Sequence, residues 1–185
     1  MGRWEPGASG RLREAAMELY VERGFDQTTV ADIAERAGVT ARTFFRYFAD
    51  KREVLFGGTA VLQETMVGAL AGAPADASPL DAVAVALDAA ADMLGENRDY
   101  ARRRQAVIAA HPDLRERELI KMESLAVALA EALRERGVPD PRAGLAAEAG
   151  VAVFRVGWVR WLDGPEGELR DVLRDGLAQL RALTA

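Results

Sequence analysis

Signals that begin and end helices recur along nearly the whole of this sequence. Ser9 precedes the first periodic segment and Gly24 follows it, while Ser78-Pro79 and Asp140-Pro141 each combine a capping side chain with a proline suited to the first helical turn. Between these signals, apolar residues are spaced by three and four positions, and no segment alternates as a half-buried strand would. The sequence therefore predicts an all-α protein.

Nine helices are expected from this pattern. They cover residues 9–23, 29–37, 40–48, 51–70, 79–94, 99–110, 113–136, 142–162 and 166–183. Residues 1–8 contain glycine and proline but no period, so we expect a loose N-terminal arm there. Residues 71–79, rich in alanine, glycine, proline and aspartate, form the clearest linker.

Side-chain chemistry excludes several classes of protein. The chain has 185 residues, no cysteine and one histidine, His111, which argues against disulfides, zinc fingers, a multi-histidine metal site and a Ser-His-Asp triad. The longest apolar stretch, residues 151–162, is interrupted by Arg155 and Arg160 and is too short to span a membrane. No secretory signal precedes the first charged helix. We expect a soluble, cytoplasmic protein with no catalytic residues, metal or membrane partner.

The charge of the chain is uneven along its length. The formal net charge is −5, but residues 1–58 carry nine basic and nine acidic side chains, so the whole imbalance lies in residues 59–185. Residues 40–52 hold an excess of three cations, since only Asp50 opposes Arg42, Arg46, Lys51 and Arg52. A local excess of this kind matters more for a phosphate surface than the total charge.

Two short helices meeting at Ala37-Gly38-Val39 predict a helix-turn-helix arrangement. Ala34 is small enough for the helices to cross closely, Gly38 permits a left-handed backbone in the turn, and Val39 fills the angle between the helices. The first turns of the second helix would face a DNA major groove with Thr40, Ala41, Arg42 and Thr43.

The aromatic residues that follow have two interpretations. Phe44 and Phe48 lie four positions apart and are expected in the core, whereas Arg46 and Tyr47 point along the flank where phosphates pass. Tyr47 could also bury its ring and leave only its hydroxyl in water. Lys51 could be a simple solvated charge, but its place at a helix start after this motif favours a phosphate contact.

This part of the chain resembles the DNA-binding domain of the tetracycline-repressor (TetR) family over residues 11–56. The resemblance is carried by Gly24-Phe25, residues 28–34 (TTVADIA), 37–40 (AGVT), 43–48 (TFFRYF) and Asp50-Lys51. It implies an N-terminal three-helix DNA-binding domain in residues 1–56. It also implies a helical domain in residues 57–185 that binds a small-molecule effector and forms a homodimer.

The resemblance also implies roles for single residues. Thr28 or Thr29 would contact phosphate, Thr43 would contact the backbone or a base, and Tyr47 and Lys51 would contact phosphates. The family often has tyrosine where this chain has Phe45, so that a thymine methyl contact replaces a hydroxyl contact. Arg42 stands where the family often has a small residue, and we expect it to read a base.

In the second domain, clustered arginines suggest an anionic ligand. Residues 102–104 are three successive arginines, Arg102, Arg103 and Arg104, and Arg155 lies in an apolar run that suggests burial. A buried arginine needs a partner, which could be Glu148, a second subunit or a ligand. The domain weakly resembles TetR-type regulators with an acyl-CoA-like ligand, whose expected contacts here also include Val107, Met122, Phe154 and Trp158. Apolar residues at these spacings are also typical of ordinary core.

The last two expected helices are apolar over more than one face, which predicts an interface. Leu145, Val156 and Leu173 are examples, and two helices per subunit would form a four-helix bundle across a two-fold axis. The sequence therefore predicts a ligand-released repressor that binds a palindromic operator. The alternative is an all-helical enzyme or adaptor of lipid or acyl metabolism, but no nucleophile, base and orienting residue occur together.

Overall fold

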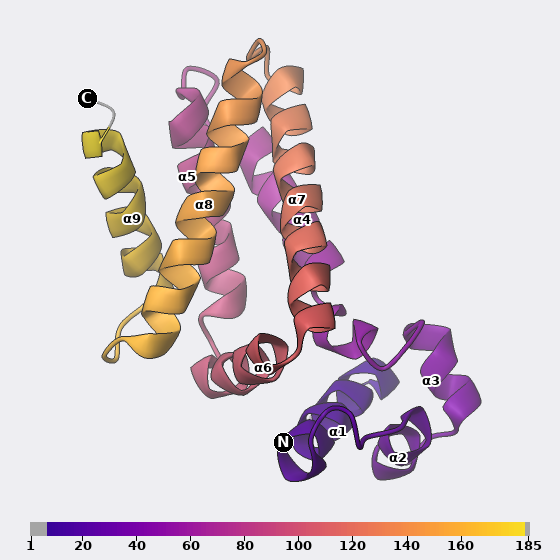
Figure 1. The fold of residues 1–185 in the computed structure, drawn as a ribbon. Coiled ribbons are helices and arrows are strands. Elements are labelled where there is room, and N and C mark those ends of the chain that lie inside the picture. Colours follow the sequence, from indigo (N-terminus) through magenta and orange to yellow (C-terminus); the bar gives the residue numbers. More distant parts are fainter. Residues whose placement is uncertain (1–6, 184–185) are drawn as a thin grey trace, which may run out of the picture. The chain divides into compact units, whose positions relative to one another are not determined.

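The computed structural model describes residues 7–183, and in these residues it contains nine α-helices, one 3-10 turn and no strand (Figure 1). The all-α expectation is confirmed. The chain forms two compact units, residues 1–58 together with 102–118, and residues 59–101 together with 119–185. The expected division into residues 1–56 and 57–185 placed residues 57–58 and 102–118 in the second domain, whereas they belong to the first unit.

The first unit is built from α1 (Ala8–Arg23), α2 (Val30–Arg36), α3 (Ala41–Tyr47) and the 3-10 turn η1 (Glu53–Phe56). It also contains parts of α6 (Arg98–Ala110) and α7 (Pro112–Glu135). Ala8 is already helical, and residues 1–6 of the predicted arm lie outside the described residues. Gly38 has a φ of +67°, as the turn between α2 and α3 requires. Fully buried side chains from every element fill this core, among them Leu12, Leu19, Ile33, Phe44 and Phe56.

The predicted continuous helix over residues 51–70 is wrong. The chain instead forms η1, a break at Gly57-Gly58, and then α4 (Thr59–Ala71). Two successive glycines weaken a helix because they lose the most backbone entropy on ordering. Gly57 also lies against the Phe48 ring, so that a Cβ atom there would be 2.8 Å from Cε1 of Phe48.

One segment of the described chain, residues 53–71, is long and apolar enough to cross a membrane by length and composition alone. The break at Gly57-Gly58 interrupts it, and Leu62, Met66 and Leu70 are buried inside the protein.

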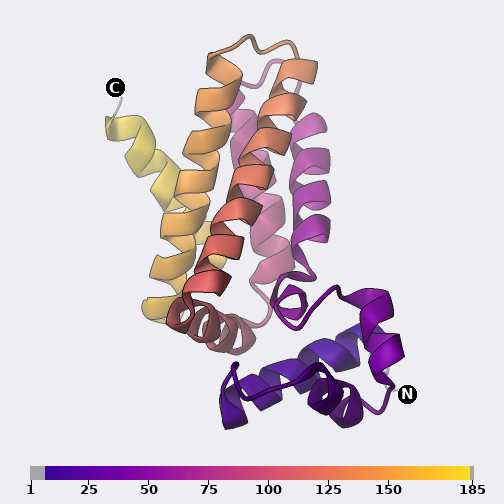
Figure 2. The same cartoon turned by 45° about the vertical axis from the view of Figure 1, so that its right-hand side comes forward.

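The second unit is a bundle of α4, α5 (Pro79–Leu94), α8 (Arg142–Asp163), α9 (Leu169–Leu183) and most of α7. The four long helices α4, α5, α7 and α8 run side by side (Figure 2). Helix α5 packs against α4, α8 and α9. Ser78 begins α5 as predicted, since its hydroxyl accepts a hydrogen bond from the Asp81 amide at 3.2 Å. Asp140, expected to cap α8, instead accepts a hydrogen bond from Nε of Arg134 at 2.9 Å.

Two glycines let α8 approach its neighbours closely. A Cβ atom at Gly150 would lie 2.5 Å from Cγ1 of Val83 on α5, and one at Gly157 would lie 2.6 Å from Cδ2 of Leu173 on α9. Val83 and Leu173 are themselves buried. Leu173, expected at a subunit interface, therefore belongs to the core of its own chain.

Candidate functional site

The exposed face of α3 is basic and aromatic. Arg42, Phe45, Arg46 and Tyr47 are exposed, with Phe45 at 58% and Tyr47 at 43% of full exposure, whereas Phe44 on the opposite face is buried. Helix α3 contains no acidic residue. Because Phe44 and Phe48 fasten the helix to the first unit, the opposite side chains of α3 are held toward solvent in one orientation.

Thr40 begins α3 by accepting a hydrogen bond from the Thr43 amide at 3.2 Å, and the hydroxyls of Thr40 and Thr43 lie 3.1 Å apart. Thr40 and Ala41 are exposed, and Thr43 is half-buried. This cap orients the first turn of the helix, which contains the residues expected to face a major groove.

Arg46 and Tyr47 form a pair at the end of α3. Nη2 of Arg46 donates a hydrogen bond to the Tyr47 hydroxyl at 3.1 Å, and the guanidinium carbon lies 4.9 Å from the centre of the ring. The ring of Tyr47 is thus not buried in the core, and a cation and a hydroxyl are presented together.

The structure corrects the expectation for Thr28. Its side chain is fully buried, and its hydroxyl donates a hydrogen bond to the carbonyl of Gly24 at 2.9 Å. The hydroxyl therefore closes the turn after α1 and cannot reach a phosphate.

Thr29, the true cap of α2, is exposed but already bonded to Asp32. The Asp32 carboxylate accepts hydrogen bonds from the Thr29 hydroxyl at 2.6 Å and the Thr29 amide at 2.8 Å. These bonds from Thr29 hold the pKa of Asp32 below its ordinary value. The hydroxyl and the amide of Thr29, which was expected to contact phosphate, are both occupied by this capping box.

Lys51 has a different role from the one expected. Its ammonium group donates to the carbonyls of Phe25 at 2.8 Å, Thr28 at 2.9 Å and Asp26 at 3.3 Å. It also lies 4.5 Å from the centre of the Phe25 ring. An ammonium group has three donors, so all of them are used inside the first unit. Lys51 positions the turn between α1 and α2.

Residues around the junction of α6 and α7 contact η1 and the turn before it within the first unit, and sequence reasoning missed this. Arg104 Nε donates to the Leu55 carbonyl at 2.7 Å. Arg117 pairs with Glu53 at 2.8 Å and with Asp50 at 3.3 Å. The partners are 49 to 67 positions apart in sequence, and nothing in the local pattern of charges indicates which carboxylate each arginine meets.

The residues expected to bind a ligand belong to both units. Arg102, Arg103, Arg104 and Val107 lie in the segment that belongs to the first unit, and Met122, Phe154, Arg155 and Trp158 lie in the second. Phe154 is buried and stacks on Trp158, with 5.9 Å between ring centres. Arg155 was expected to be buried, but its side chain is exposed on α8.

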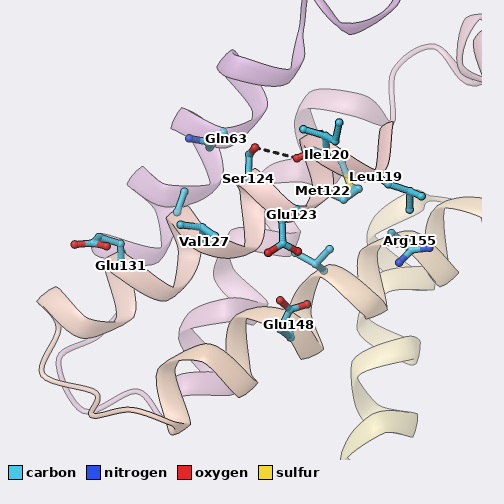
Figure 3. Close-up of a pocket in the computed structure, with 12 residues that line it drawn as sticks. Gln63, Leu119, Ile120, Met122, Glu123, Ser124, Val127, Glu131, Glu148 and Arg155 are labelled. Atoms are coloured by element: carbon cyan, nitrogen blue, oxygen red, sulfur yellow. Dashed lines mark hydrogen bonds between the residues drawn. The ribbon is translucent and has the colours of Figure 1, made fainter. Parts of the chain in front are cut away.

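A groove of about 770 Å³ lies between α4, α7 and α8 in the second unit (Figure 3). Of the expected ligand residues, Met122 and Arg155 line it. The remaining lining residues are Gln63, Leu119, Ile120, Glu123, Ser124, Val127, Ala128, Glu131, Glu148 and Val151. The volume is within the usual range of sites for small molecules.

Helix α8 also has an exposed stripe of small and apolar side chains, which we call the α8 stripe. Its members recur at spacings of three and four: Leu145, Ala152, Val156 and Val159 are exposed, and Ala149 among them is half-buried. Leu145 is 67% and Val156 is 69% exposed. Large apolar side chains this exposed along one helix are typical of an interface.

Two short helices joined by a tight turn, with a basic exposed second helix, define a helix-turn-helix DNA-binding protein. The family model for bacterial regulatory proteins of the tetR family matches residues 12–56, and that for the MftR C-terminal domain matches residues 77–185. The chain belongs to the tetR family of bacterial regulatory proteins.

Individual relatives agree with this assignment. The transcriptional regulator TcmR of Streptomyces glaucescens is 40% identical over 89 residues, which span 48% of this chain but only 38% of TcmR. The structure of FadR from Thermus thermophilus, a repressor of the same family solved with lauroyl-CoA, is 27% identical with a TM-score of 0.58 over 94% of this chain and 93% of FadR. A tetR-family regulator from Syntrophomonas wolfei, 14% identical, shares the fold with a TM-score of 0.69 over 95% of this chain and 94% of its own. All three are named as regulators or repressors of transcription.

Proposed function

We propose that this protein regulates transcription by binding a palindromic operator as a homodimer. The observation that carries the proposal is the exposed face of α3, which presents two arginines and two aromatic side chains and no carboxylate. In helix-turn-helix proteins the second helix enters the major groove. The family to which the chain belongs supports the same role for this helix.

The contacts can be assigned to two kinds. Arg42 lies in the first turn of α3, where a guanidinium can reach a base edge, and Phe45 lies one turn later, where its ring can meet a thymine methyl group. Arg46 and Tyr47 would bind phosphate through the cation and hydroxyl that they present together. Lys51 would act indirectly, because it positions the turn before α2.

The α8 stripe is the proposed dimer contact. Packing it against the same stripe of a second copy would remove Leu145, Val156 and Val159 from water, and a two-fold axis would bring each stripe against itself. A symmetric dimer presents two copies of α3 to half-sites about 34–36 Å apart, one turn of the DNA helix. This spacing is the physical reason for a palindromic operator.

The groove between α4, α7 and α8 is the proposed effector site. An acyl-CoA effector, expected from the sequence, is supported by the lauroyl-CoA complex of FadR. It would require cations, and Arg155 is the one guanidinium among the groove-lining residues in the described chain. Arg104, expected to share this role, is committed to Leu55 and Glu118 in the first unit.

Repression would be released by a population shift. An effector that favours one arrangement of α7 would act on a helix whose first turns hold Asp50 and Glu53 through Arg117. A coupling of about 1–3 kcal/mol would change operator affinity roughly 5–150-fold. The repressor assignment follows from this scheme and from the named repressor among the relatives.

Selection of duplexes from a random pool by the purified protein tests the proposal. We expect enrichment of a palindrome with half-sites one helical turn apart. The logarithm of the binding constant should fall linearly with the logarithm of salt concentration, because phosphate contacts release counterions. An unenriched pool, or binding that does not depend on salt, would contradict DNA binding by α3. A selected site without symmetry would contradict the dimer.

A further inference from the structure

Helix α8 carries five charged side chains, and in the described part of the chain only one of them has a partner. Arg160 pairs with Asp175 of α9. The other four are exposed, and none of them makes a hydrogen bond or ion pair with another described residue. They are Arg142 and Asp163 at the two ends of the helix, and Glu148 and Arg155 nearer its middle.

Glu148 and Arg155 have opposite charges but cannot pair with each other inside one chain. They are seven residues apart, which is about 10 Å along the helix at 1.5 Å per residue. Figure 3 shows the two side chains separated along α8. Seven residues are also nearly two full turns, so both side chains lie on one edge of the α8 stripe, beside the groove that both line. A partner for Arg155 must therefore come from outside its own helix.

The four charges are arranged about Ala152 so that opposite signs stand at nearly equal distances from it. Glu148 lies four positions before Ala152, and Arg155 lies three positions after it. Arg142 lies ten positions before Ala152, and Asp163 lies eleven positions after it. A helix with this pattern is complementary in charge to a copy of itself that runs in the opposite direction.

The apolar residues of the α8 stripe have the same centre. Leu145 and Val159, 67% and 50% exposed, are each seven positions from Ala152. If a two-fold axis crosses the helix at Ala152, Leu145 of one copy lies beside Val159 of the other. Ala152 is itself small and exposed, so that two helices can approach closely at the axis. Apolar contacts and charges therefore favour the same register.

We propose that α8 packs antiparallel against α8 of a second copy, with the two-fold axis at Ala152 and with Glu148 of each copy paired with Arg155 of the other. This inference rests on the proposed dimer contact, and it assigns the direction and register of the two helices. Parallel packing would place each charge against the same charge, and repulsion disfavours it. A guanidinium has five donors, so Arg155 can also bind an anionic effector in the groove.

Cross-linking through introduced cysteines tests the register, because the chain has no cysteine of its own. Ala152→Cys should join two chains by a disulfide under mild oxidation, because a residue at the axis meets its own copy. Leu145→Cys should not, because its two copies would lie about 20 Å apart along the helices. Combining Leu145→Cys with Val159→Cys should restore the covalent dimer. Val61→Cys, an exposed position on α4, is the control and should not cross-link.

Charge reversal tests the ion pairs. Glu148→Arg and Arg155→Glu should each weaken the dimer about tenfold or more at low salt, because each creates two like-charge contacts across the axis. The double variant exchanges the two charges and should recover the wild-type dissociation constant within about threefold. Glu135→Arg, at an exposed position of α7 outside the groove, should leave that constant unchanged. Sedimentation measures the constants, and circular dichroism checks that each variant is folded.

The outcomes distinguish this inference from the proposed function on which it rests. A dimeric wild type whose Ala152→Cys variant does not cross-link would overturn the register but leave the dimer standing. A double charge variant that stays as weak as the single variants would do the same. A wild type that sediments as a monomer would overturn the proposed dimer and this register together.

Discussion

Arg42 and Arg46 lie one turn apart on the exposed face of α3, but they differ in what holds them. Arg46 is fixed against Tyr47 by a hydrogen bond and by contact with the ring face. For Arg42, the described residues offer no hydrogen bond or ion pair. A fixed cation suits a phosphate, whose position does not depend on sequence, and an unconstrained guanidinium can align with a guanine edge.

Replacing each of the two arginines should therefore affect DNA binding in a different way. Arg42→Ala should cost about 1–3 kcal/mol at one or two base pairs and relax the preference there, with the salt dependence little changed. Arg46→Ala should weaken binding to all sequences and reduce the salt slope by about one. Binding constants on the selected operator and on single-base variants, each over a range of salt, measure both effects. If the two variants behaved alike, the assignment of base and phosphate contacts would be wrong.

At the level of helices, α8 combines glycines that face the core with apolar residues that face solvent. Gly150 and Gly157 are seven residues apart, two turns on the same side of the helix, and they face Val83 and Leu173. The α8 stripe occupies exposed positions of the same helix. Burial on one side and exposure on another explain why the sequence of α8 is apolar over more than one face.

Replacing Gly150 should destabilise the protein although alanine is the better helix former. The new methyl group of Gly150→Ala would sit 2.5 Å from Val83, whose short side chain is fully buried. We expect a loss of about 1–3 kcal/mol in the free energy of unfolding, because the packed core must shift. Gly144→Ala is the matched control in the same helix, since nothing lies within 4 Å of its added Cβ. It should gain up to about 1 kcal/mol. Urea unfolding of both variants compares them, and a stabilised Gly150→Ala would refute the close approach.

At the scale of the whole molecule, function requires that two copies act together. The α8 stripe is the most exposed apolar surface of α8, and Val156 lies within it at 69% exposure. In a two-fold contact a residue near the axis meets its own copy, so a charge introduced there is opposed by an identical charge.

Val156→Glu should therefore convert the dimer to a folded monomer and abolish tight operator binding, although no residue of α3 is altered. Sedimentation should show wild type near twice 20.0 kDa and the variant near 20.0 kDa, with unchanged helix content by circular dichroism. Val61→Glu, at a similarly exposed position on α4, should remain a dimer. A Val156→Glu protein that stays dimeric would place the interface elsewhere.

Much of the fold and part of the DNA interface could be predicted because local signals determine them. The conformation or burial expected from close neighbours in sequence is found at four positions, Gly38, Thr40, Phe44 and Phe48. The break at Gly57-Gly58 was missed although both glycines were visible, because the apolar period continues through them. Arg155 was expected to be buried because its sequence neighbours are apolar. On a helix with two apolar faces, however, the local sequence does not determine which way one side chain points.

The sequence by itself determined the helical class, the helix-turn-helix and the basic character of α3, since period, capping and turn chemistry act over short distances. Only the tertiary structure decided which polar groups are already used. From the sequence, Lys51 and Thr28 are expected to contact phosphate. In the folded chain their donors are instead bonded to backbone carbonyls in and beside the turn before α2. The contacts of Arg104 with Leu55 and of Arg117 with Glu53, inside the first unit, likewise depend on the folded chain. A polar group bonds to the partners that packing places beside it, and the packing of the whole core determines which partners these are.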